Sequence, residues 1–295
     1  MQSLQGNAAR RRFLSALGAG VLGAVFAPWC SSARGVPRPH VRLGFTPAFV
    51  HDQYALLADW RRYMETRLGV EVEFKQRDRY RETMDLLQLR QLDFAWLCDY
   101  PFLHLGDMVR LLAVPLYKGR PYYQSFIIVA ADNRSVAGLK DLRDVVFAYA
   151  DPLSNSGYLS PRYALLQLGE DPRTFFRKTF FTFSHKKVVE AVAVGLAEGG
   201  AVDSFVWETL ARIEPELTAR TRIVEQSPEY GFPPFAAHRD VDPDLFDAVQ
   251  AFLLDMPADA EGAALLKRLY LDGFIRGDAG LYAGVADMMR ALGEL

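Results

Sequence analysis

The pattern of apolar and polar positions predicts alternating strands and helices in the first part of the chain. Residues 41–45 and 70–74 have the pattern of strands, and the segment 53–68 between them carries apolar side chains at helical spacing. A second helix near 80–92 leads into the apolar run 94–97, which is typical of a buried strand. Such alternation with short connections indicates an α/β fold whose sheet is largely parallel and covered by helices.

A second αβ unit begins near residue 122. Its strands are expected at 122–130, 145–149, 178–183 and 200–204. Its helices are expected near 160–168 and 187–198. After a short apolar run at 222–224 the chain shows only helical patterns, near 243–255, 258–270 and 280–292. A terminal helical block with no sheet of its own must pack on an existing lobe, and we expect it to pack on the first.

These elements predict two αβ lobes joined by two chain crossings, near residues 117–124 and 222–230. We expect lobe 1 to comprise residues 34–120 plus 226–295, and lobe 2 to comprise residues 121–225. Two lobes with two crossings place a ligand cleft between them and permit hinge closure.

Residues 1–33 have the features of an export signal. Arginines at positions 10–12 precede an apolar, small-residue run, 13–27, in the outline of a twin-arginine signal peptide. This run is shorter than the roughly 20 residues needed to span a bilayer. We expect cleavage after Ala33 and a free protein in the periplasm, with an uncleaved membrane anchor as the alternative.

Composition and charge narrow the classes of function. The chain has 295 residues, of which 50% are hydrophobic and 24% charged, as in a soluble globular protein. Its formal net charge is -2, its basic residues are scattered, and loss of the signal would remove three arginines, so no nucleic-acid partner is expected. Loss of Cys30 with the signal would leave Cys98 alone, so no intramolecular disulfide is expected.

The most informative stretch is 151–158, with the sequence Asp-Pro-Leu-Ser-Asn-Ser-Gly-Tyr. It follows a predicted strand and precedes a predicted helix, where several backbone N–H groups have no partner. Such a helix start binds anions through these N–H groups and the helix dipole, and serine hydroxyls add donors. Ser and Asn are also ordinary N-cap residues, and the spacing alone leaves both interpretations open.

Two more polar residues follow predicted strands. His185, after Ser184, would donate a hydrogen bond to an anion in the cleft, although an ordinary surface or core histidine has the same pattern. Asp203 would repel an anion unless the ligand keeps a proton to donate, as hydrogen phosphate, phosphite and phosphonate do and sulfate does not at neutral pH. A helix N-cap is the alternative for Asp203.

Aromatic residues crowd the expected lobe junctions, and a tyrosine hydroxyl is a neutral donor suited to an oxyanion. These residues are Tyr80, Trp96, Tyr100, Tyr122, Tyr123 and Tyr230. We find no motif for a nucleophile elbow, a phosphate-binding loop, a zinc site or a cofactor. Ser154 or Ser156, His185 and Asp203 follow a possible chain order for a catalytic triad, but without an elbow we expect neither an enzyme nor a cofactor.

Together these segments resemble the phosphate-, phosphite- and phosphonate-binding periplasmic proteins of ABC importers. The resemblance rests on the 151–158 motif with Pro161, on Phe181-x-x-Ser184-His185, and on 200–204, and it spans roughly residues 41–275. It extends to Tyr80 ahead of a helix, to 92–96 before the cleft, and to 122–125 at the hinge. Each match is short, but their order and spacing together are specific.

The resemblance implies a type II periplasmic-binding-protein fold and capture of a phosphorus oxyanion for an ABC permease. The ligand-binding positions that it implies are Tyr80, Tyr123, Ser154, Asn155, Ser156 and His185, with a cleft acid at or near Asp203 or Glu208. A sensor of the same fold that signals to a membrane kinase or receptor is the alternative, and a periplasmic hydrolase is the least supported. A monomer is expected.

The sequence departs from the family pattern at several positions. Asn155 stands where many members have threonine between the two serines. Pro233 stands near the position of an acid in aminophosphonate binders. Asp99 and Tyr100 replace smaller residues that often follow the strand of Trp96. These departures concern the ligand rather than the fold.

Overall fold

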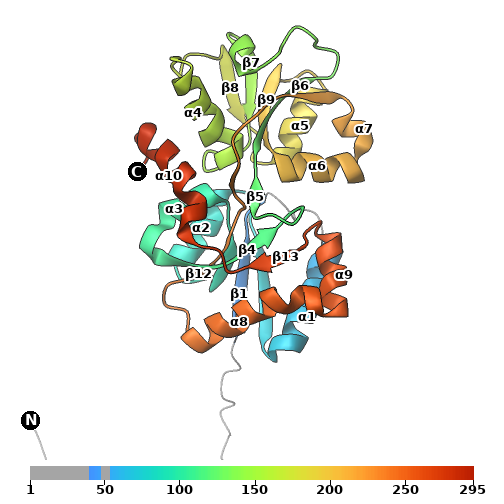
Figure 1. Cartoon of the computed structure of the whole chain (residues 1–295), viewed down its shortest axis with the longest axis vertical. Coiled ribbons are helices and arrows are strands. Elements are labelled where there is room, and N and C mark those ends of the chain that lie inside the picture. The colour runs from blue at the N-terminus through green and yellow to red at the C-terminus, as the bar shows by residue number, and fades with distance from the viewer. Residues whose placement is uncertain (1–39, 48–53) are drawn as a thin grey trace, which may run out of the picture. The chain divides into compact units, whose positions relative to one another are not determined.

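The computed structural model describes residues 40–47 and 54–295, so the predicted signal at 1–33 lies outside the described part. The described residues form two αβ lobes, each built on its own sheet (Figure 1). No helix in this part of the chain combines the length and the apolar character needed to cross a bilayer.

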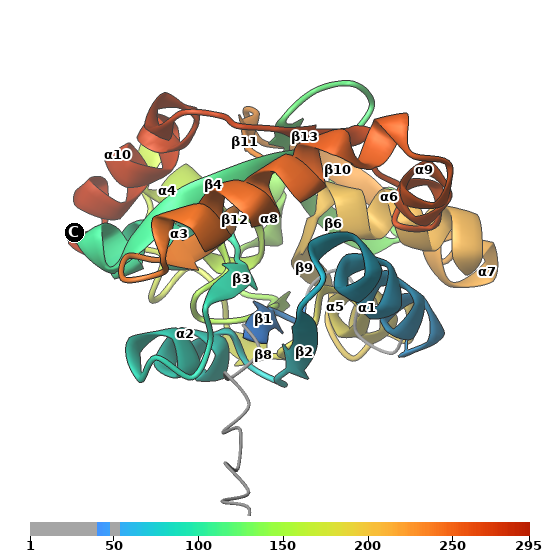
Figure 2. The same ribbon diagram turned by 90° about the horizontal axis from the view of Figure 1, so that it is seen from below.

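Lobe 1 contains a six-stranded sheet with the order β13-β4-β12-β3-β1-β2. Its strands are β1 (His40–Phe45), β2 (Glu71–Gln76), β3 (Phe94–Trp96), β4 (Val109–Leu116), β12 (Phe235–His238) and β13 (Gly273–Ile275). β1 is parallel to β2 and β3, whereas β12 runs antiparallel to both β3 and β4. The helices of this lobe are α1 (Tyr54–Leu68), α2 (Tyr80–Gln88), α3 (Asp99–Leu105), α8 (Pro243–Asp255) and α9 (Ala260–Arg268). Figure 2 shows α1 and α9 on one side of β1 and α2 on the other.

Apolar residues at the predicted helical spacing attach α1 to this sheet. Leu57, Trp60 and Met64 are buried, and the Trp60 ring lies 5.7 Å from that of Phe45 in β1 and 6.0 Å from that of Phe235 in β12. Aromatic rings at these separations add to the stabilisation from burial. The carboxyl end of β3 is thereby held in a rigid core.

Lobe 2 contains a five-stranded sheet with the order β10-β6-β9-β7-β8. Its strands are β6 (Ser125–Ala130), β7 (Val146–Tyr149), β8 (Lys178–Phe181), β9 (Gly199–Asp203) and β10 (Thr221–Gln226). Its helices are α4 (Ser160–Gln167), α5 (His185–Ala193), α6 (Ser204–Ile213) and α7 (Pro215–Thr218), and a short π-helical segment, η3 (Asn155–Leu159), precedes α4. α4 lies on one side of the sheet and α5 and α6 on the other (Figure 1).

Both faces of this second sheet are buried. Along β6, Phe126 and Ile128 belong to the apolar cluster under α5 and α6, and Ile127 and Val129 belong to the cluster under α4. Because successive side chains of a strand point to opposite faces, a strand covered on both sides is apolar throughout. That is why the sequence shows this strand as a continuous apolar run.

Two short strands link the lobes. β5 (Tyr122–Tyr123) and β11 (Tyr230–Gly231) pair antiparallel, and β5 lies between the two sheets in Figure 1. The first crossing spans 117–124, between β4 and β6. The second spans 227–234 rather than the expected 222–230, because β10 continues to Gln226. A last helix, α10 (Ala283–Ala291), packs against α3 of lobe 1 and against α4 and η3 of lobe 2.

The terminal block is not purely helical, and this prediction was wrong. Its helices lie close to the expected ranges, but β12 and β13 add two strands to the sheet of lobe 1, and β4 was also not predicted. β13 has three residues and β12 has four, and all but Ile275 are buried, so neither shows an alternating pattern. β4 contains Pro115, which interrupts its strand signal. Both sheets are therefore mixed rather than largely parallel.

Candidate functional site

The seven predicted site residues are all buried, and they come from both lobes and the hinge. Tyr80, Tyr123, Ser154, Asn155, Ser156, His185 and Asp203 are each at most 2% exposed. Tyr80 begins α2 of lobe 1, Tyr123 lies in β5, and the other five surround η3 and the start of α5 in lobe 2. Hydrogen bonds among them join all except Ser156 into two groups, one centred on His185 and one on Asn155.

His185 joins Tyr80 of lobe 1 to lobe 2. Its Nε2 atom lies 3.3 Å from the Tyr80 hydroxyl and 3.4 Å from Ser154 Oγ, and its Nδ1 accepts the backbone N–H of Asp203 at 3.1 Å. Because Nδ1 accepts, the proton of the neutral ring is on Nε2. Burial lowers the pKa of His185 to about 3, so the ring is neutral at physiological pH. The buried cluster therefore contains a neutral N–H donor at Nε2, beside the hydroxyls of Tyr80 and Ser154.

The turn before α5 sets the position of this histidine. Phe183 has a positive φ of 56°, which is unusual for an aromatic residue, and its N–H donates to the carbonyl of Ala150 at 2.7 Å. Ser184 then caps α5, and His185 is the first residue of the helix. Backbone strain of this kind concentrates at functional sites, where the surrounding structure enforces it.

The segment 154–157 combines helix capping with unsatisfied polar groups. Ser154 Oγ accepts the N–H of Gly157 at 3.0 Å, which confirms the capping interpretation for this serine. In contrast, Ser156 Oγ and Asn155 Oδ1 are buried without a hydrogen-bond partner among the described residues. Buried polar atoms normally have partners, so these two are free to bond to a ligand or to water. Four other buried side-chain atoms of the described residues also lack a partner, in Trp60, Arg110, Tyr149 and Thr209, but Asn155 and Ser156 are adjacent in the chain.

Only glycine fits at position 157. A Cβ atom there would lie 2.4 Å from Cβ of Ala150 and 3.0 Å from Cε1 of His185. The backbone of this segment therefore lies directly against the imidazole ring, which brings the start of η3 and His185 to the same place.

A second group of contacts surrounds Asn155. Its Nδ2 donates to Asp99 Oδ2 at 2.8 Å and to the Tyr123 hydroxyl at 3.1 Å, and Tyr123 donates to Asp99 Oδ1 at 2.8 Å. Asp99 begins α3 in lobe 1 and is fully buried. Burial raises its pKa to about 6, against the effect of the donors around it. The sequence identified Asp99 only as a departure from the family pattern, not as a site residue.

Asp203 caps a helix and also lies within this buried cluster. Its Oδ1 accepts the N–H groups of Phe205 and Val206 at 2.7 and 3.2 Å, so the N-cap prediction for this residue is confirmed. Burial raises its pKa to about 8, and the Asp99 and Glu208 carboxylates add to that rise. Asp203 is therefore mainly protonated at neutral pH.

Several other candidates have partners outside this cluster. The Tyr100 hydroxyl donates to Glu294, the Tyr230 hydroxyl bonds to Ser160 Oγ, and Glu208 pairs with Lys118. Trp96 Nε1 donates to the Pro233 carbonyl at 3.0 Å.

The predicted residues do not form a catalytic triad. In a triad the carboxylate accepts from the imidazole Nδ1–H, whereas here His185 Nδ1 is itself the acceptor, and its donor is the backbone of Asp203. Within the described residues, no group of three acidic, His or Cys side chains is arranged to hold a metal ion.

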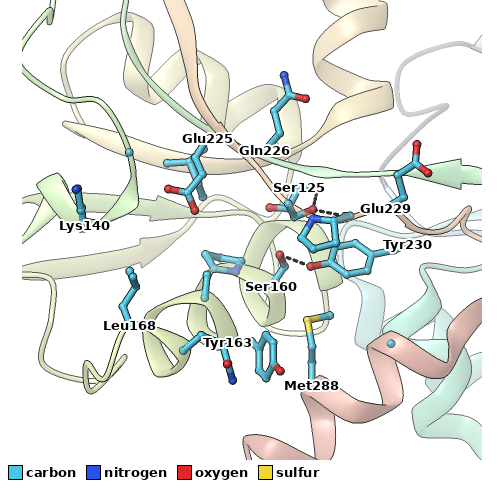
Figure 3. A pocket seen from close by; sticks show the side chains of 18 of the residues that line it. Ser125, Lys140, Ser160, Tyr163, Leu168, Glu225, Gln226, Glu229, Tyr230 and Met288 are labelled. Atoms are coloured by element: carbon cyan, nitrogen blue, oxygen red, sulfur yellow. Dashed lines mark hydrogen bonds between the residues drawn. The ribbon is translucent and has the colours of Figure 1, made fainter.

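A separate groove lies near the hinge, between α4, β10 and α10 (Figure 3). It has a volume of about 750 Å³, and none of the seven predicted site residues lines it. Its wall includes the Ser160–Tyr230 hydrogen bond, and the Tyr230 ring lies 6.1 Å from that of Tyr123. The groove and the buried cluster are therefore separate features of the described residues.

Comparison with solved structures places the fold. PhnD1 from Prochlorococcus marinus in complex with methylphosphonate matches with a TM-score of 0.79 at 20% identity, over 87% of this chain and 99% of that one. A binding protein component of an ABC phosphonate transporter from Pseudomonas aeruginosa also gives 0.79 at 20% identity, over 85% of each chain. The aliphatic sulphonate binding protein SsuA of Escherichia coli gives 0.61 at 16% identity, over 86% of this chain and 87% of that one. These matches confirm the predicted type II periplasmic-binding-protein fold.

Comparison with known sequences gives the family. The phosphate-import protein PhnD of Mycolicibacterium smegmatis is 26% identical over 73% of this chain and 69% of its own length. The probable phosphite binding protein PhnD1 of Prochlorococcus marinus is 26% identical over 57% of this chain, and that match spans only 59% of the relative. The sequence profile described as "ABC transporter, phosphonate, periplasmic substrate-binding protein" matches residues 43–282. The chain therefore belongs to the phosphonate-type family of periplasmic substrate-binding proteins of ABC transporters.

Proposed function

We propose that this protein captures a phosphorus oxyanion, namely phosphate, phosphite or a phosphonate, in its cleft and delivers it to the transmembrane subunits of an ABC importer. The observation that supports this most directly is the pair of buried, unpartnered atoms Ser156 Oγ and Asn155 Oδ1 at the start of η3, in the same buried cluster as the neutral His185 Nε2–H. The names of the relatives, which bind phosphate, phosphite or methylphosphonate, support the same class of ligand.

Neutral hydrogen-bond donors are sufficient for useful affinity. A micromolar Kd corresponds to about -8 kcal/mol, and a hydrogen bond to a charged group contributes about 1.5–3 kcal/mol. The donors that we assign to the ligand are the Tyr80 hydroxyl, Ser154, Ser156 and His185 Nε2–H. Tyr123 gives its one proton to Asp99 Oδ1 and accepts from Asn155 Nδ2, so its role is to hold these two side chains beside the ligand. The contacts of the four donors and of Tyr123 within the described residues involve neutral groups and carboxylates, with no lysine or arginine side chain.

A hydrogen bond between the Asp203 carboxyl group and a ligand oxygen requires one proton, which either partner can supply. Because burial raises the pKa of Asp203 to about 8, the carboxyl group carries that proton at neutral pH. At higher pH the proton must come from the ligand, as it does from hydrogen phosphate or a hydrogen phosphonate. The proposed role of Asp203 is therefore compatible with its confirmed role as a helix cap, since the cap uses only Oδ1.

The family places the protein in the periplasm or an equivalent compartment outside the cytoplasm. We propose export by the twin-arginine route, which the arginines at 10–12 and the apolar run 13–27 support. We further propose a monomer with lobe 1 at 34–120 plus 226–295 and lobe 2 at 121–225, which agrees with the membership of the two sheets to within a residue or so at β10.

Thermal unfolding with a set of ligands tests this function. A ligand at 100-fold excess over Kd stabilises the folded state by about 2.7 kcal/mol, which raises Tm by on the order of 5–10 °C for a chain of this size. We expect such a shift with at least one of phosphate, phosphite and methylphosphonate, and a smaller shift or none with sulfate. The Ser156→Ala variant should lose most of the shift. No shift with any phosphorus oxyanion would refute the proposed ligand class.

A further inference from the structure

Two residues that depart from the family pattern are hydrogen-bonded to each other across the lobes. Asp99 is the first residue of α3 in lobe 1, and Asn155 is the first residue of η3 in lobe 2, 56 positions later in the chain. Asn155 Nδ2 lies 2.8 Å from Asp99 Oδ2, and both side chains are fully buried. The asparagine and the aspartate are therefore parts of one arrangement.

This contact fixes the direction of the Asn155 amide. An ionised carboxylate only accepts hydrogen bonds, so the NH2 group of the amide must face Asp99. Tyr123 gives its own proton to Asp99 Oδ1, so its oxygen accepts from the same NH2 group, at 3.1 Å. Both contacts require the same orientation, and the carbonyl oxygen Oδ1 points away from them without a partner.

Asp99 is itself held in place by several donors. Besides Asn155 and Tyr123, its carboxylate accepts from the Cys98 thiol at 3.0 Å and from the backbone N–H of Tyr100 at 3.0 Å. Since a carboxylate with this many donors has few other positions available, it acts as a fixed acceptor that orients the amide.

We propose that Asp99 and Asn155 determine which protonation state of the ligand is bound: the Asn155 carbonyl accepts a hydrogen bond from a P–OH group, so the bound form is the monoprotonated phosphorus oxyanion. This inference rests on the proposed function. Asn155 Oδ1 and Ser156 Oγ are both buried without a partner at the start of η3, so in the proposed site we assign both of them to oxygens of the tetrahedral group. An oxygen without hydrogen would face the carbonyl lone pairs and be repelled, as a sulfate oxygen would be.

The titratable groups around Asp99 and Asn155 determine whether proton uptake on ligand binding can be assigned to the ligand. The other titratable groups in the cluster are Cys98, Tyr80, Tyr123, Tyr230, Tyr282, His185 and Asp203. Burial raises the pKa of the thiol and of each tyrosine above its ordinary value, and it lowers the pKa of His185. Between about pH 7 and 9, the ligand and Asp203 are therefore the groups that change protonation here.

Calorimetric proton counting with methylphosphonate tests the proposal. Binding is measured in buffers of different ionisation enthalpy at about one pH unit above the second pKa of the ligand, where the free ligand is mostly the dianion. The wild-type protein is the parent, and the proton that Asn155 accounts for is the difference in uptake between the parent and each variant, because Asp203 is the same in all of them. We expect uptake of about one proton on binding, and a Kd that rises about tenfold per pH unit.

Two variants of the parent protein disrupt the Asp99–Asn155 hydrogen bond, or the carbonyl that it orients, in different ways. Asn155→Thr replaces the carbonyl with a hydroxyl that donates to an unprotonated oxygen. Asp99→Ala frees the amide, which then turns its NH2 group toward the ligand. Both should lower proton uptake by about one proton relative to the parent and flatten the dependence of Kd on pH. Circular dichroism of each variant checks the fold, and a folding failure in one leaves the other as the test.

The outcomes separate the inference from the proposed function. Binding of methylphosphonate without proton uptake in the parent protein would overturn the inference and leave the proposed function standing. Uptake that is as large in Asn155→Thr as in the parent would overturn it, because the proton would then be held elsewhere. Tighter binding of 2-aminoethylphosphonate than of methylphosphonate, without proton uptake, would also overturn it. The donor to the Asn155 carbonyl would then be the ammonium group of the ligand and not a P–OH group. Wild-type protein that binds no phosphorus oxyanion would refute both.

Discussion

Two substitutions at His185 separate its contact with the protein from its proposed contact with the ligand. The ring accepts the Asp203 N–H through Nδ1, and its Nε2–H, which we assign to the ligand, lies beside the Tyr80 and Ser154 hydroxyls. In His185→Asn, the amide oxygen occupies nearly the position of Nδ1, and no donor remains at the position of Nε2. In His185→Gln, an amide nitrogen reaches nearly the position of Nε2, and the acceptor for Asp203 is lost.

The two variants should therefore have opposite effects. Loss of a donor to an anionic ligand costs about 1.5–3 kcal/mol, so we expect Kd to rise roughly 10- to 150-fold in His185→Asn with little change in stability. In His185→Gln the buried N–H of Asp203 has no acceptor, which lowers the free energy of unfolding by about 1–3 kcal/mol while Kd changes less.

Urea denaturation of the ligand-free protein and calorimetry with methylphosphonate measure these two quantities. His185→Ala, which removes both atoms, should show both losses and serves as the reference. If His185→Asn binds as tightly as the wild-type protein, then Nε2–H does not contact the ligand, and the site must be redrawn around Asn155 and Ser156.

Three further predictions follow from contacts near this histidine. Ser156→Ala removes a buried hydroxyl that has no partner, so the ligand-free variant should be as stable as the wild-type protein in urea denaturation but bind the ligand more weakly. Ser154→Ala removes the hydroxyl that accepts the Gly157 N–H, so this variant should lose about 0.5–2 kcal/mol of stability as well as affinity. Equal stability losses in the two serine variants would contradict this assignment. Gly157→Ala places a Cβ atom 2.4 Å from that of Ala150 and should lower stability by about 1–3 kcal/mol and Tm accordingly, whereas Gly284→Ala, with nothing within 4 Å, should leave Tm unchanged or higher. The pKa of Asp203 is raised from 3.8 to about 8, so between these pH values the folded state binds one more proton than the unfolded state. The free energy of unfolding therefore falls as pH rises from about 4 to about 8, by at most about 1.4 kcal/mol per pH unit. Asp203→Asn should therefore gain stability relative to the wild-type protein between pH 5 and 8 in denaturation experiments, and parallel pH curves would contradict the buried position of the carboxyl group.

The sequence predicted those parts of the molecule whose signal is local. The helix at 243–255 has the predicted bounds, because Asp242 caps it and its apolar spacing continues to its end. The segment 151–158 was recognised because its capping residues and its glycine are adjacent in the chain. β12 and β13 were missed because strands of three and four residues have no periodicity to read, and because they enter the sheet only through tertiary pairing.

The structure adds to the site the contacts that depend on the approach of distant segments. Nothing near residue 99 or residue 155 indicates that the two side chains meet, since they come from different lobes and only the tertiary fold brings them to 2.8 Å. The tautomer of His185 likewise follows from a backbone N–H that lies 18 residues away in the chain. Residue types at the site were therefore predictable, but the direction in which each side chain donates or accepts was not.

The charge balance of the closed cleft favours the same form of the ligand as the hydrogen bonds do. At neutral pH His185 is uncharged and Asp203 carries a proton, so Asp99, ionised above its pKa of about 6, contributes the negative charge of this cluster. Two like charges about 6 Å apart repel by about 3 kcal/mol at an effective dielectric constant of about 20. A ligand that keeps one proton has one charge fewer to be repelled by Asp99, and it also supplies the hydrogen that Asn155 Oδ1 lacks. Under the proposed function, Asp99 therefore favours a protonated oxyanion in two ways, through its charge and through the orientation that it gives the Asn155 amide.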